Sequence, residues 1–128
     1  MIVDDDVELL DTLSIVLSSM GYRVTGARSG PEGIKLMESG ERYEVIITDL
    51  RMRRMDGNWF LRIAKLIDPS CKVVMMSAYA TVESMVNAIR EDVYDYLLKP
   101  FKIAELQEIL SKVSREAKSS TLPRGNTP

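Results

Sequence analysis

Short apolar runs alternate with longer amphipathic segments along nearly the whole chain, and this alternation constrains the fold more than any other feature of the sequence. The short runs are rich in Val, Ile and Met and have the length of strands, whereas the longer segments repeat apolar residues at helical spacing. Strands that alternate with helices predict a parallel sheet with helices packed on both of its faces. The chain is therefore expected to have an α/β fold.

Five strands and five helices are expected from this pattern. The predicted strands are residues 1–3, 23–27, 45–48, 72–77 and 94–98. The predicted helices lie between Asp6 and Gly21, between Ser29 and Gly40, over 59–67, over 81–91 and over 103–113. Asp6 is suited to cap the first helix, and Trp59 is expected to anchor the third.

Composition and charge exclude several classes of function. The chain has 128 residues, which is enough for one domain, and its 17 basic and 19 acidic residues give a net charge of −2. Outside Arg51, Arg53 and Arg54 the sequence has no basic cluster, so nucleic acid is not expected as a direct partner of this segment. The sequence has no His, which excludes His-based triads, His general bases and His metal ligands.

The cytoplasm is the expected location. Cys71 is the only Cys, so no internal disulfide can form, and this fits a reducing compartment. No apolar run approaches the roughly 20 residues that a membrane span needs. The first residues are acidic, whereas a secretory signal begins with basic residues. Neither a membrane partner nor secretion is therefore expected.

The end of the sequence differs from the rest. Beyond about residue 118 it is polar, rich in Pro and Gly, and without periodicity. We therefore expect one domain over residues 1–118 and a linker or disordered tail over residues 119–128.

Reactive side chains stand at the ends of four of the five predicted strands. Asp4 and Asp5 follow the first strand, Asp49 follows the third, Ser77 ends the fourth, and Lys99 follows the fifth. Because parallel α/β sheets bind ligands beyond the carboxyl ends of their strands, these groups are expected to converge at one edge. Taken singly, each has an ordinary explanation, since an acid at a strand end often caps a helix and a lone Lys or Ser is usually solvated. Their coincidence favours a functional site.

The chemistry of these groups fits a divalent cation and a phosphoryl group. Carboxylates crowded together as Asp4, Asp5 and Asp49 repel one another unless a cation compensates them. Their hard oxygens select Mg²⁺ or Mn²⁺, and the lack of Cys and His ligands disfavours zinc. Lys99 can pair with a carboxylate or a phosphoryl oxygen, and Ser77 can donate a hydrogen bond. An Asp oxygen can attack phosphorus and form an acyl phosphate.

Five stretches of sequence occur in order over about residues 1–116 and together make a specific pattern: Ile2-Val3-Asp4-Asp5-Asp6, Ile47-Thr48-Asp49-Leu50-Arg51-Met52, Met55-Asp56-Gly57, Met76-Ser77-Ala78-Tyr79-Ala80-Thr81 and Tyr94-Asp95-Tyr96-Leu97-Leu98-Lys99-Pro100-Phe101. This pattern resembles the receiver domain of two-component response regulators. The resemblance implies a flavodoxin-like, doubly wound, five-stranded parallel sheet of order 2-1-3-4-5 with helices on both faces. It also implies a phosphorylation-switched signalling domain, rather than an enzyme, that assists its own phosphotransfer and dephosphorylation. The phosphoryl group is expected from the phosphohistidine of a sensor histidine kinase.

The same resemblance implies a phosphoacceptor and a set of metal ligands. Asp49 is the expected phosphoacceptor. Asp5 is expected to bind Mg²⁺ (or Mn²⁺) directly and Asp4 mostly through water. Asp49 and the main-chain carbonyl of Arg51 complete the expected ligands.

The remaining roles implied by the resemblance concern the response to phosphorylation. Lys99 is expected to contact the phosphoryl group and Ser77 to hydrogen-bond it, while Tyr96 turns inward as Ser77 moves. Lys99-Pro100 corresponds to the family's cis peptide bond. The surface of the fourth helix, fifth strand and fifth helix is expected to change and to be read by a partner or by a second copy in a homodimer.

The output is expected to lie outside this segment. Residues 77–86 are similar to receivers fused to AAA+ activators of sigma-54 promoters. An output domain C-terminal to the segment, controlling transcription, is therefore expected.

Three positions depart from the family pattern. Arg53 stands where Pro is common, which is expected to loosen the loop after Asp49. Asp92 stands where a Gly usually precedes the fifth strand, and the turn is expected to survive because Asp tolerates left-handed backbone. Only three residues precede Asp4, so either the first strand is short or the chain was trimmed.

Two other functions are weaker alternatives. A haloacid-dehalogenase-like phosphohydrolase also uses an Asp nucleophile with Mg²⁺, and Asp4, Asp6 and Ser77 partly match its motifs. However, Glu8 stands where that family has Thr or Val, and no acidic pair follows Lys99 at the end of another strand. A flavodoxin-like cofactor module is disfavoured because no Gly-rich or Ser/Thr-rich phosphate loop follows the first strand.

Overall fold

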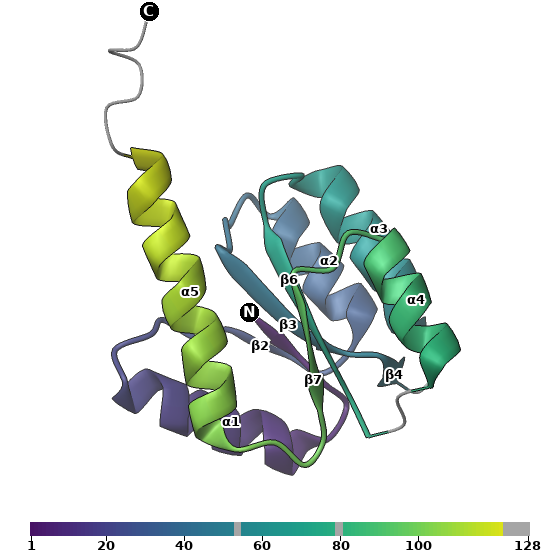
Figure 1. The fold of residues 1–128 in the computed structure, drawn as a ribbon, viewed down its shortest axis with the longest axis horizontal. Helices are drawn as coiled ribbons and strands as arrows, with labels where there is room; N and C mark the ends of the chain where they lie inside the picture. The colour runs from purple at the N-terminus through teal and green to yellow at the C-terminus, as the bar shows by residue number, and fades with distance from the viewer. Residues whose placement is uncertain (53–54, 79–80, 122–128) are drawn as a thin grey trace, which may run out of the picture.

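A five-stranded parallel sheet runs through the centre of the molecule (Figure 1). The computed structural model describes residues 1–52, 55–78 and 81–121. The strand order is β2-β1-β3-β6-β7, and every neighbouring pair is parallel. The strands are β1 (Ile2–Val3), β2 (Gly26–Ala27), β3 (Val45–Asp49), β6 (Lys72–Ser77) and β7 (Asp95–Leu98). Numbered within this sheet, the order is 2-1-3-4-5, so the predicted flavodoxin-like topology is confirmed.

Helices cover both faces of this sheet. In the described part of the chain they are α1 (Val7–Ser19), α2 (Gly30–Glu38), α3 (Gly57–Ile67), α4 (Val82–Arg90) and α5 (Ile103–Thr121). Figure 1 shows α1 and α5 on one face and α2, α3 and α4 on the other. The doubly wound arrangement expected from the alternation of strands and helices is therefore confirmed.

Each face of the sheet has its own apolar core, and alternate strand residues supply the two cores. In β6, Val73 and Met75 pack with residues of α2 and α3. Val74 and Met76 pack with residues of α1 and α5. All four are fully buried, which explains why the strand is a continuous apolar run in the sequence.

The third helix is anchored by Phe60 and not by Trp59. Phe60, Leu61 and Ala64 are fully buried, whereas Trp59 is 41% exposed. The buried residues recur at helical spacing on the face that packs on the sheet, and Trp59 lies beside that stripe. The prediction for Trp59 is wrong because helical periodicity, rather than ring size, decides which residues are buried.

Side-chain caps fix where helices begin. The carboxylate of Asp6 accepts a hydrogen bond from the backbone N–H of Leu9 at 3.2 Å, as predicted for the start of α1. At the start of α4, Thr81 and Ser84 form a reciprocal capping box, each side chain accepting from the backbone N–H of the other. These caps set the ends of the two loops that flank the carboxyl edge of the sheet.

The second strand is shorter than predicted. β2 covers Gly26–Ala27 instead of 23–27, because its neighbour β1 pairs with it only at Ile2 and Val3. A strand forms only where a neighbour supplies its hydrogen bonds. β1 itself has two residues, in line with the short first strand expected from the sequence.

A small antiparallel sheet after β3 was not predicted. It consists of β4 (Arg51–Met52) and β5 (Met55–Asp56), which are too short to leave a periodic signal in the sequence. Arg53 and Arg54 lie outside the described residues, so the expectation that Arg53 loosens this loop stays a prediction.

Two local predictions near the end of the sheet are confirmed. Asp92 has a positive φ of 61°, and the Lys99-Pro100 peptide bond is cis. The last helix continues to Thr121, beyond residue 118 where the domain was expected to end, and residues 122–128 lie outside the described part. Among the described helices, none combines the length and apolar character needed to cross a membrane.

Candidate functional site

The carboxyl ends of the strands bring four of the predicted side chains to one edge of the sheet. β3 ends at Asp49 and β6 at Ser77, and these strands are parallel neighbours. Lys99 follows β7, and its backbone N–H donates to the carbonyl of Ser77 at 2.8 Å. Asp4 follows β1, which is the other neighbour of β3. The parallel topology therefore gathers these residues from four strands, as the sequence predicts.

Lys99 bridges the two buried carboxylates of this edge. Its Nζ lies 2.7 Å from Oδ2 of Asp49 and 2.9 Å from Oδ2 of Asp4. Asp4 is fully buried and Asp49 is 8% exposed. The second oxygen of each carboxylate accepts a backbone N–H at 2.9 Å, from Asp6 for Asp4 and from Arg51 for Asp49. Both carboxylates are thus held in fixed orientations.

Burial and charge act in opposite directions on this ionic group. Burial raises the pKa of Asp4, and this outweighs the hydrogen bonds from Asp6 and Lys99, which lower it. Burial by itself would lower the pKa of Lys99, but its hydrogen bonds to Asp49 and Asp4 raise the pKa above the usual 10.5. Lys99 is therefore a firmly charged ammonium between two carboxylates.

The donor atoms at this edge fit a hard divalent cation. The carboxylates of Asp4, Asp5 and Asp49 and the carbonyl of Arg51 all supply oxygen, which Mg²⁺ and Mn²⁺ prefer. Asp5 is half-buried next to Asp4. Within the described residues, no group of three or more acidic, His or Cys side chains is already close enough to hold a metal ion. Lys99, rather than a third carboxylate, lies between Asp4 and Asp49.

Ser77 and Tyr96 lie on neighbouring strands beside this edge. Ser77 is buried at the end of β6. Tyr96 lies on β7 opposite Met75 and packs against the apolar core on the α2, α3 and α4 face. Its hydroxyl oxygen is buried and has no hydrogen-bond partner within the described part of the chain. The Tyr96 ring thus already points into the protein.

Gly57 supports Asp49 through a close backbone contact whose role the sequence alone does not reveal. The N–H of Gly57 donates to the carbonyl of Leu50 at 2.8 Å. A Cβ at residue 57 would lie 2.7 Å from the carbonyl oxygen of Asp49 and 2.7 Å from the Cα of Leu50. Only Gly allows this approach. The pair Asp56-Gly57 was the available sequence signal, but it indicates only a turn.

Known proteins resemble this chain along its sequence. Residues 1–111 match the family model of the response regulator receiver domain. The transcriptional regulatory protein ZraR of Klebsiella oxytoca is 33% identical over 128 residues, which is 100% of this chain and 29% of that protein. The chain spans between about a quarter and three tenths of the curated relatives that it matches.

Solved structures resemble its fold. A response regulator receiver domain protein (CheY-like) from Methanospirillum hungatei JF-1 has a TM-score of 0.85 and 29% identity, covering 92% of this chain and 94% of that one. A response regulator protein from Burkholderia pseudomallei, solved with a phosphorylated aspartic acid, a calcium ion and citrate, has a TM-score of 0.80 and 24% identity. That match covers 96% of this chain and 72% of the other, and it concerns the fold alone.

Proposed function

This chain belongs to the response regulator receiver domain family, and from that premise we propose that Asp49 accepts a phosphoryl group from the phosphohistidine of a sensor histidine kinase. The observation that carries the proposal is the contact of Lys99 with both Asp49 and Asp4, at 2.7 and 2.9 Å. This contact fixes a positive charge on the carboxylate that ends β3, where the charge of a phosphoryl group would develop.

The transfer requires little covalent chemistry from the protein. An oxygen of Asp49 forms a bond to phosphorus, the P–N bond of the phosphohistidine breaks, and the departing imidazole keeps the electron pair and takes a proton from solvent. Lys99 offsets the charge of the phosphoryl oxygens, and Ser77 donates a hydrogen bond to one of them. Positioning and charge neutralisation then account for the rate.

We assign Mg²⁺ or Mn²⁺ as the cofactor on the chemistry of the oxygen donors. The proposed ligands are Asp5, Asp49, the carbonyl of Arg51 and, through water, Asp4. When bound, the cation offsets negative charge on the carboxylates and on the phosphoryl oxygens. The same residues are proposed to assist dephosphorylation, so that the domain influences the lifetime of its own signal.

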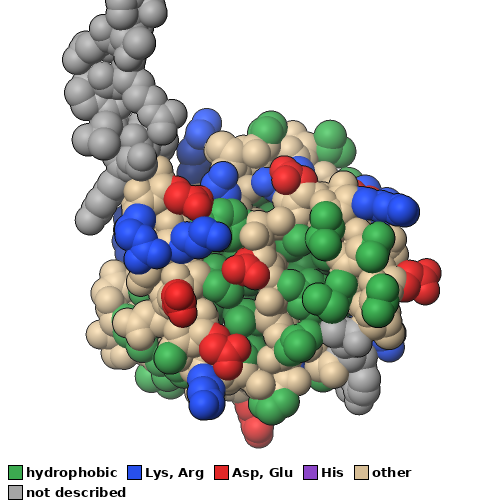
Figure 2. Space-filling model, viewed as in Figure 1, with side chains coloured by type: hydrophobic (Ala, Val, Ile, Leu, Met, Phe, Trp, Pro, Cys, Tyr) green, Lys and Arg blue, Asp and Glu red, His purple; other side chains and the backbone are tan. Residues whose placement is uncertain are grey.

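The proposed output surface consists of α4, β7 and α5. Four residues separate Ser77 from α4, so a shift of the Ser77 hydroxyl toward a phosphoryl group would move the start of α4 and the space around Tyr96. Large apolar side chains are exposed here: Val82 is 81% exposed, Ile89 is 74% exposed and Leu98 is 52% exposed. Figure 2 shows apolar side chains gathered over α4 on this face. Such a surface fits a partner protein or a second copy in a homodimer.

The wider protein is proposed to be a transcription regulator. ZraR, named as a transcriptional regulatory protein, is more than three times as long as this segment, which matches 29% of it. We propose that an output domain follows C-terminal to α5, joined through residues 122–128. The similarity of residues 77–86 to receivers of sigma-54-dependent AAA+ activators favours that class, with the cytoplasm as its location. Nucleic acid is then bound by the output domain and not by this segment.

The site of phosphorylation can be mapped directly. The protein is treated with acetyl phosphate and Mg²⁺, and the acyl phosphate is reduced with borohydride and located by mass spectrometry. The label is expected on Asp49 and should disappear in Asp49→Asn, while Asp11→Asn, which changes an exposed acid on α1, serves as the matched control. A label on Asp4 would favour the dehalogenase-like function, and no label on any Asp would contradict both.

The metal assignment has a separate test. Mg²⁺ is expected to raise the thermal unfolding midpoint of the protein, because a ligand that binds only the folded state stabilises it by mass action. Asp5→Ala should remove this response and block phosphorylation, and it should unfold at an equal or higher temperature in the absence of metal because one carboxylate is lost. Unchanged phosphorylation in Asp5→Ala would remove Asp5 from the proposed ligands.

A further inference from the structure

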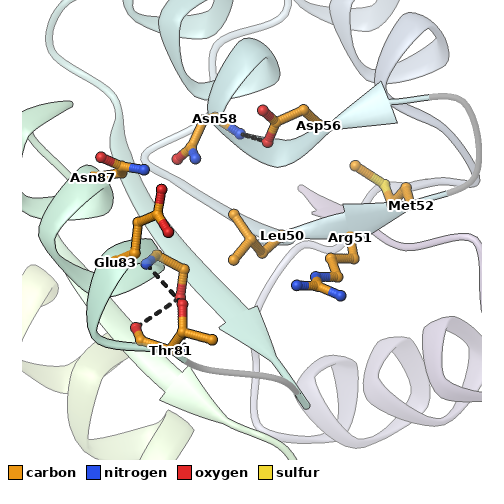
Figure 3. Close-up of a pocket in the computed structure, with 9 residues that line it drawn as sticks. Leu50, Arg51, Met52, Asp56, Asn58, Thr81, Glu83 and Asn87 are labelled. Atoms are coloured by element: carbon orange, nitrogen blue, oxygen red, sulfur yellow. Dashed lines mark hydrogen bonds between the residues drawn. The ribbon is translucent and has the colours of Figure 1, made fainter.

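A cleft of about 540 Å³ lies next to the carboxyl edge, between the residues that follow β3 and the first turns of α4 (Figure 3). One side consists of Leu50, Met52 and Asn58, and the other includes Glu83 and Asn87. In Figure 3 the side-chain ends of Asn58, Glu83 and Asn87 point toward the same space. The function proposed above uses none of these three polar groups.

The most informative atom in the cleft is Oδ1 of Asn58. This oxygen is buried, and no group in the described part of the chain donates a hydrogen bond to it. A buried carbonyl oxygen without a donor is unfavourable, and native proteins rarely keep one without a reason. The Asn58 side chain is therefore suited to receive a hydrogen-bond donor from a ligand.

The neighbouring hydroxyl groups do not satisfy this oxygen. Those of Thr81 and Ser84 belong to the capping box at the start of α4, and the Ser84 hydroxyl donates to the carbonyl of Thr81 at 3.0 Å. Asp56 accepts the backbone N–H of Asn58 at 2.9 Å. Within the described part of the chain, neither these hydroxyl groups nor a backbone N–H of the cleft supplies the donor that Oδ1 of Asn58 lacks.

The charge of the cleft also favours a ligand whose hydrogen-bond donors carry a positive charge. Among the described residues that line the cleft, Asp56 and Glu83 contribute two negative charges and Arg51 one positive charge, which leaves one net negative charge. In the view of Figure 3, the Arg51 guanidinium lies on the other side of Leu50 from Asn58 and Asn87. An anionic ligand would meet two carboxylates here, whereas a cation would meet acceptors.

We propose that this cleft binds an alkyl guanidinium group. A guanidinium carries five N–H donors in one plane, which can reach the carboxylate of Glu83 and the amide oxygens of Asn58 and Asn87 together. The apolar side chains of Leu50 and Met52 provide a surface for the methylene chain that precedes the guanidinium. An arginine side chain of a partner protein and a free guanidinium compound share this chemistry.

The test measures backbone amide NMR shifts of the domain during titration, with no Mg²⁺ and no phosphodonor, so that it is independent of the function of Asp49. Capped arginine (N-acetyl-arginine methylamide) represents a protein side chain and agmatine represents a free compound. Both are expected to shift the amides around residues 58 and 83–87. Capped citrulline, which has the same shape without the charge, is expected to leave them unchanged.

The variants separate this site from general surface attraction. Glu83→Gln is expected to weaken binding about fivefold, whereas Glu108→Gln, an exposed acid on α5, leaves it unchanged. Asn58→Leu is expected to abolish binding and to raise the thermal unfolding midpoint, because it removes the buried oxygen that lacks a donor. Tighter binding of capped arginine than of agmatine would assign a protein partner, and the reverse order would assign a free ligand. Equal shifts with citrulline, or unchanged affinity in Glu83→Gln, would overturn the proposal.

Discussion

Nζ of Lys99 lies 2.7 Å from Oδ2 of Asp49, although fifty residues separate the two in the chain. The same ammonium contacts the fully buried Asp4 at 2.9 Å, so one cation holds together three strands of the sheet. The raised pKa of Lys99 means that its stabilising contribution is complete below pH 10.5 and is lost only as the pH rises through the folded-state pKa. The functional edge of the sheet is therefore also part of its stability.

Replacing Lys99 with Met is expected to lower the free energy of unfolding at pH 7 by about 3 kcal/mol, because it leaves two buried like charges without a cation. The loss of free energy of unfolding should be smaller at acidic pH than at pH 7. As the pH falls through the raised pKa of Asp4, that carboxyl becomes neutral and the repulsion disappears. Urea unfolding at pH 7 and pH 4 measures both effects. Lys99→Arg keeps the positive charge, so its free energy of unfolding should fall less than that of Lys99→Met. An equal loss at the two pH values would contradict this account.

Replacing Gly57 with Ala is expected to destabilise the protein by about 2 kcal/mol and to reduce the phosphorylation of Asp49. The new Cβ would meet the backbone of Asp49 and Leu50 at 2.7 Å, and backbone atoms cannot move aside as a side chain can. Gly33→Ala is the matched control, because its Cβ would meet the Phe60 ring at 3.0 Å, away from Asp49. Chemical denaturation and labelling by acetyl phosphate measure the two effects. Equal labelling of Gly57→Ala and the native chain would show that the contact does not position Asp49.

The amino group of Met1 gives a third prediction, for a polypeptide that starts at this residue. It is buried and donates to the carbonyl of Val45 at 2.9 Å, and its burial lowers its pKa from 8.0 to about 6. Between these values the folded state binds fewer protons than the unfolded state, so the free energy of unfolding rises with pH, by about 2–3 kcal/mol in total. The chain has no His that could titrate in the same range. Urea unfolding at pH 6 and pH 8 tests this, and the rise should vanish when the amino group is acetylated.

The sequence predicts the edge of the sheet well because its residues are tied to strand ends. Asp49, Ser77 and Lys99 each end or follow a recognisable apolar run, and parallel topology brings such ends together. Asp4 and Asp49 are separated by 45 positions, yet the position of each on its own strand is sufficient to predict that they lie close. Local patterns therefore determine this part of the site.

The remaining features depend on distances that no local pattern encodes. The length of β2 follows from how far β1 extends beside it, and β4 and β5 are too short for periodicity to detect. The contact of Gly57 with Asp49 and the cleft between Asn58 and Glu83 both depend on how α3 and α4 pack beyond the sheet. Tertiary packing decides these, and a single sequence does not reveal it.

The buried hydroxyl of Tyr96 gives the last prediction, which concerns the proposed switch. This oxygen has no hydrogen-bond partner in the described part of the chain, so the inward position of the ring carries an energetic cost of about 1 kcal/mol or more. A switch requires two states within a few kcal/mol of each other, so that one phosphoryl group can invert their populations. Tyr96→Phe removes the cost of the buried hydroxyl while it keeps the ring. The ratio of the inward to the outward state should therefore rise about fivefold without any phosphoryl group.

NMR spectra with and without beryllofluoride, which mimics the phosphoryl group, provide the measurement. In the native chain, beryllofluoride is expected to shift resonances from Asp49 through Thr81 to Tyr96, and the unliganded spectrum of Tyr96→Phe should move toward that bound spectrum. Ser77→Ala is expected to have the opposite effect on the Tyr96 resonances. This variant should still bind beryllofluoride at Asp49, but the shifts at Tyr96 should become smaller than in the native chain. If the shifts in the native chain stay at the carboxyl edge and never reach Tyr96, or if Tyr96→Phe moves the spectrum away from the bound form, the ring does not report phosphorylation. If both variants behave as expected, the hydroxyl of Ser77 and the ring of Tyr96 belong to one two-state element. Transmission from Asp49 to the surface of α4 requires such an element.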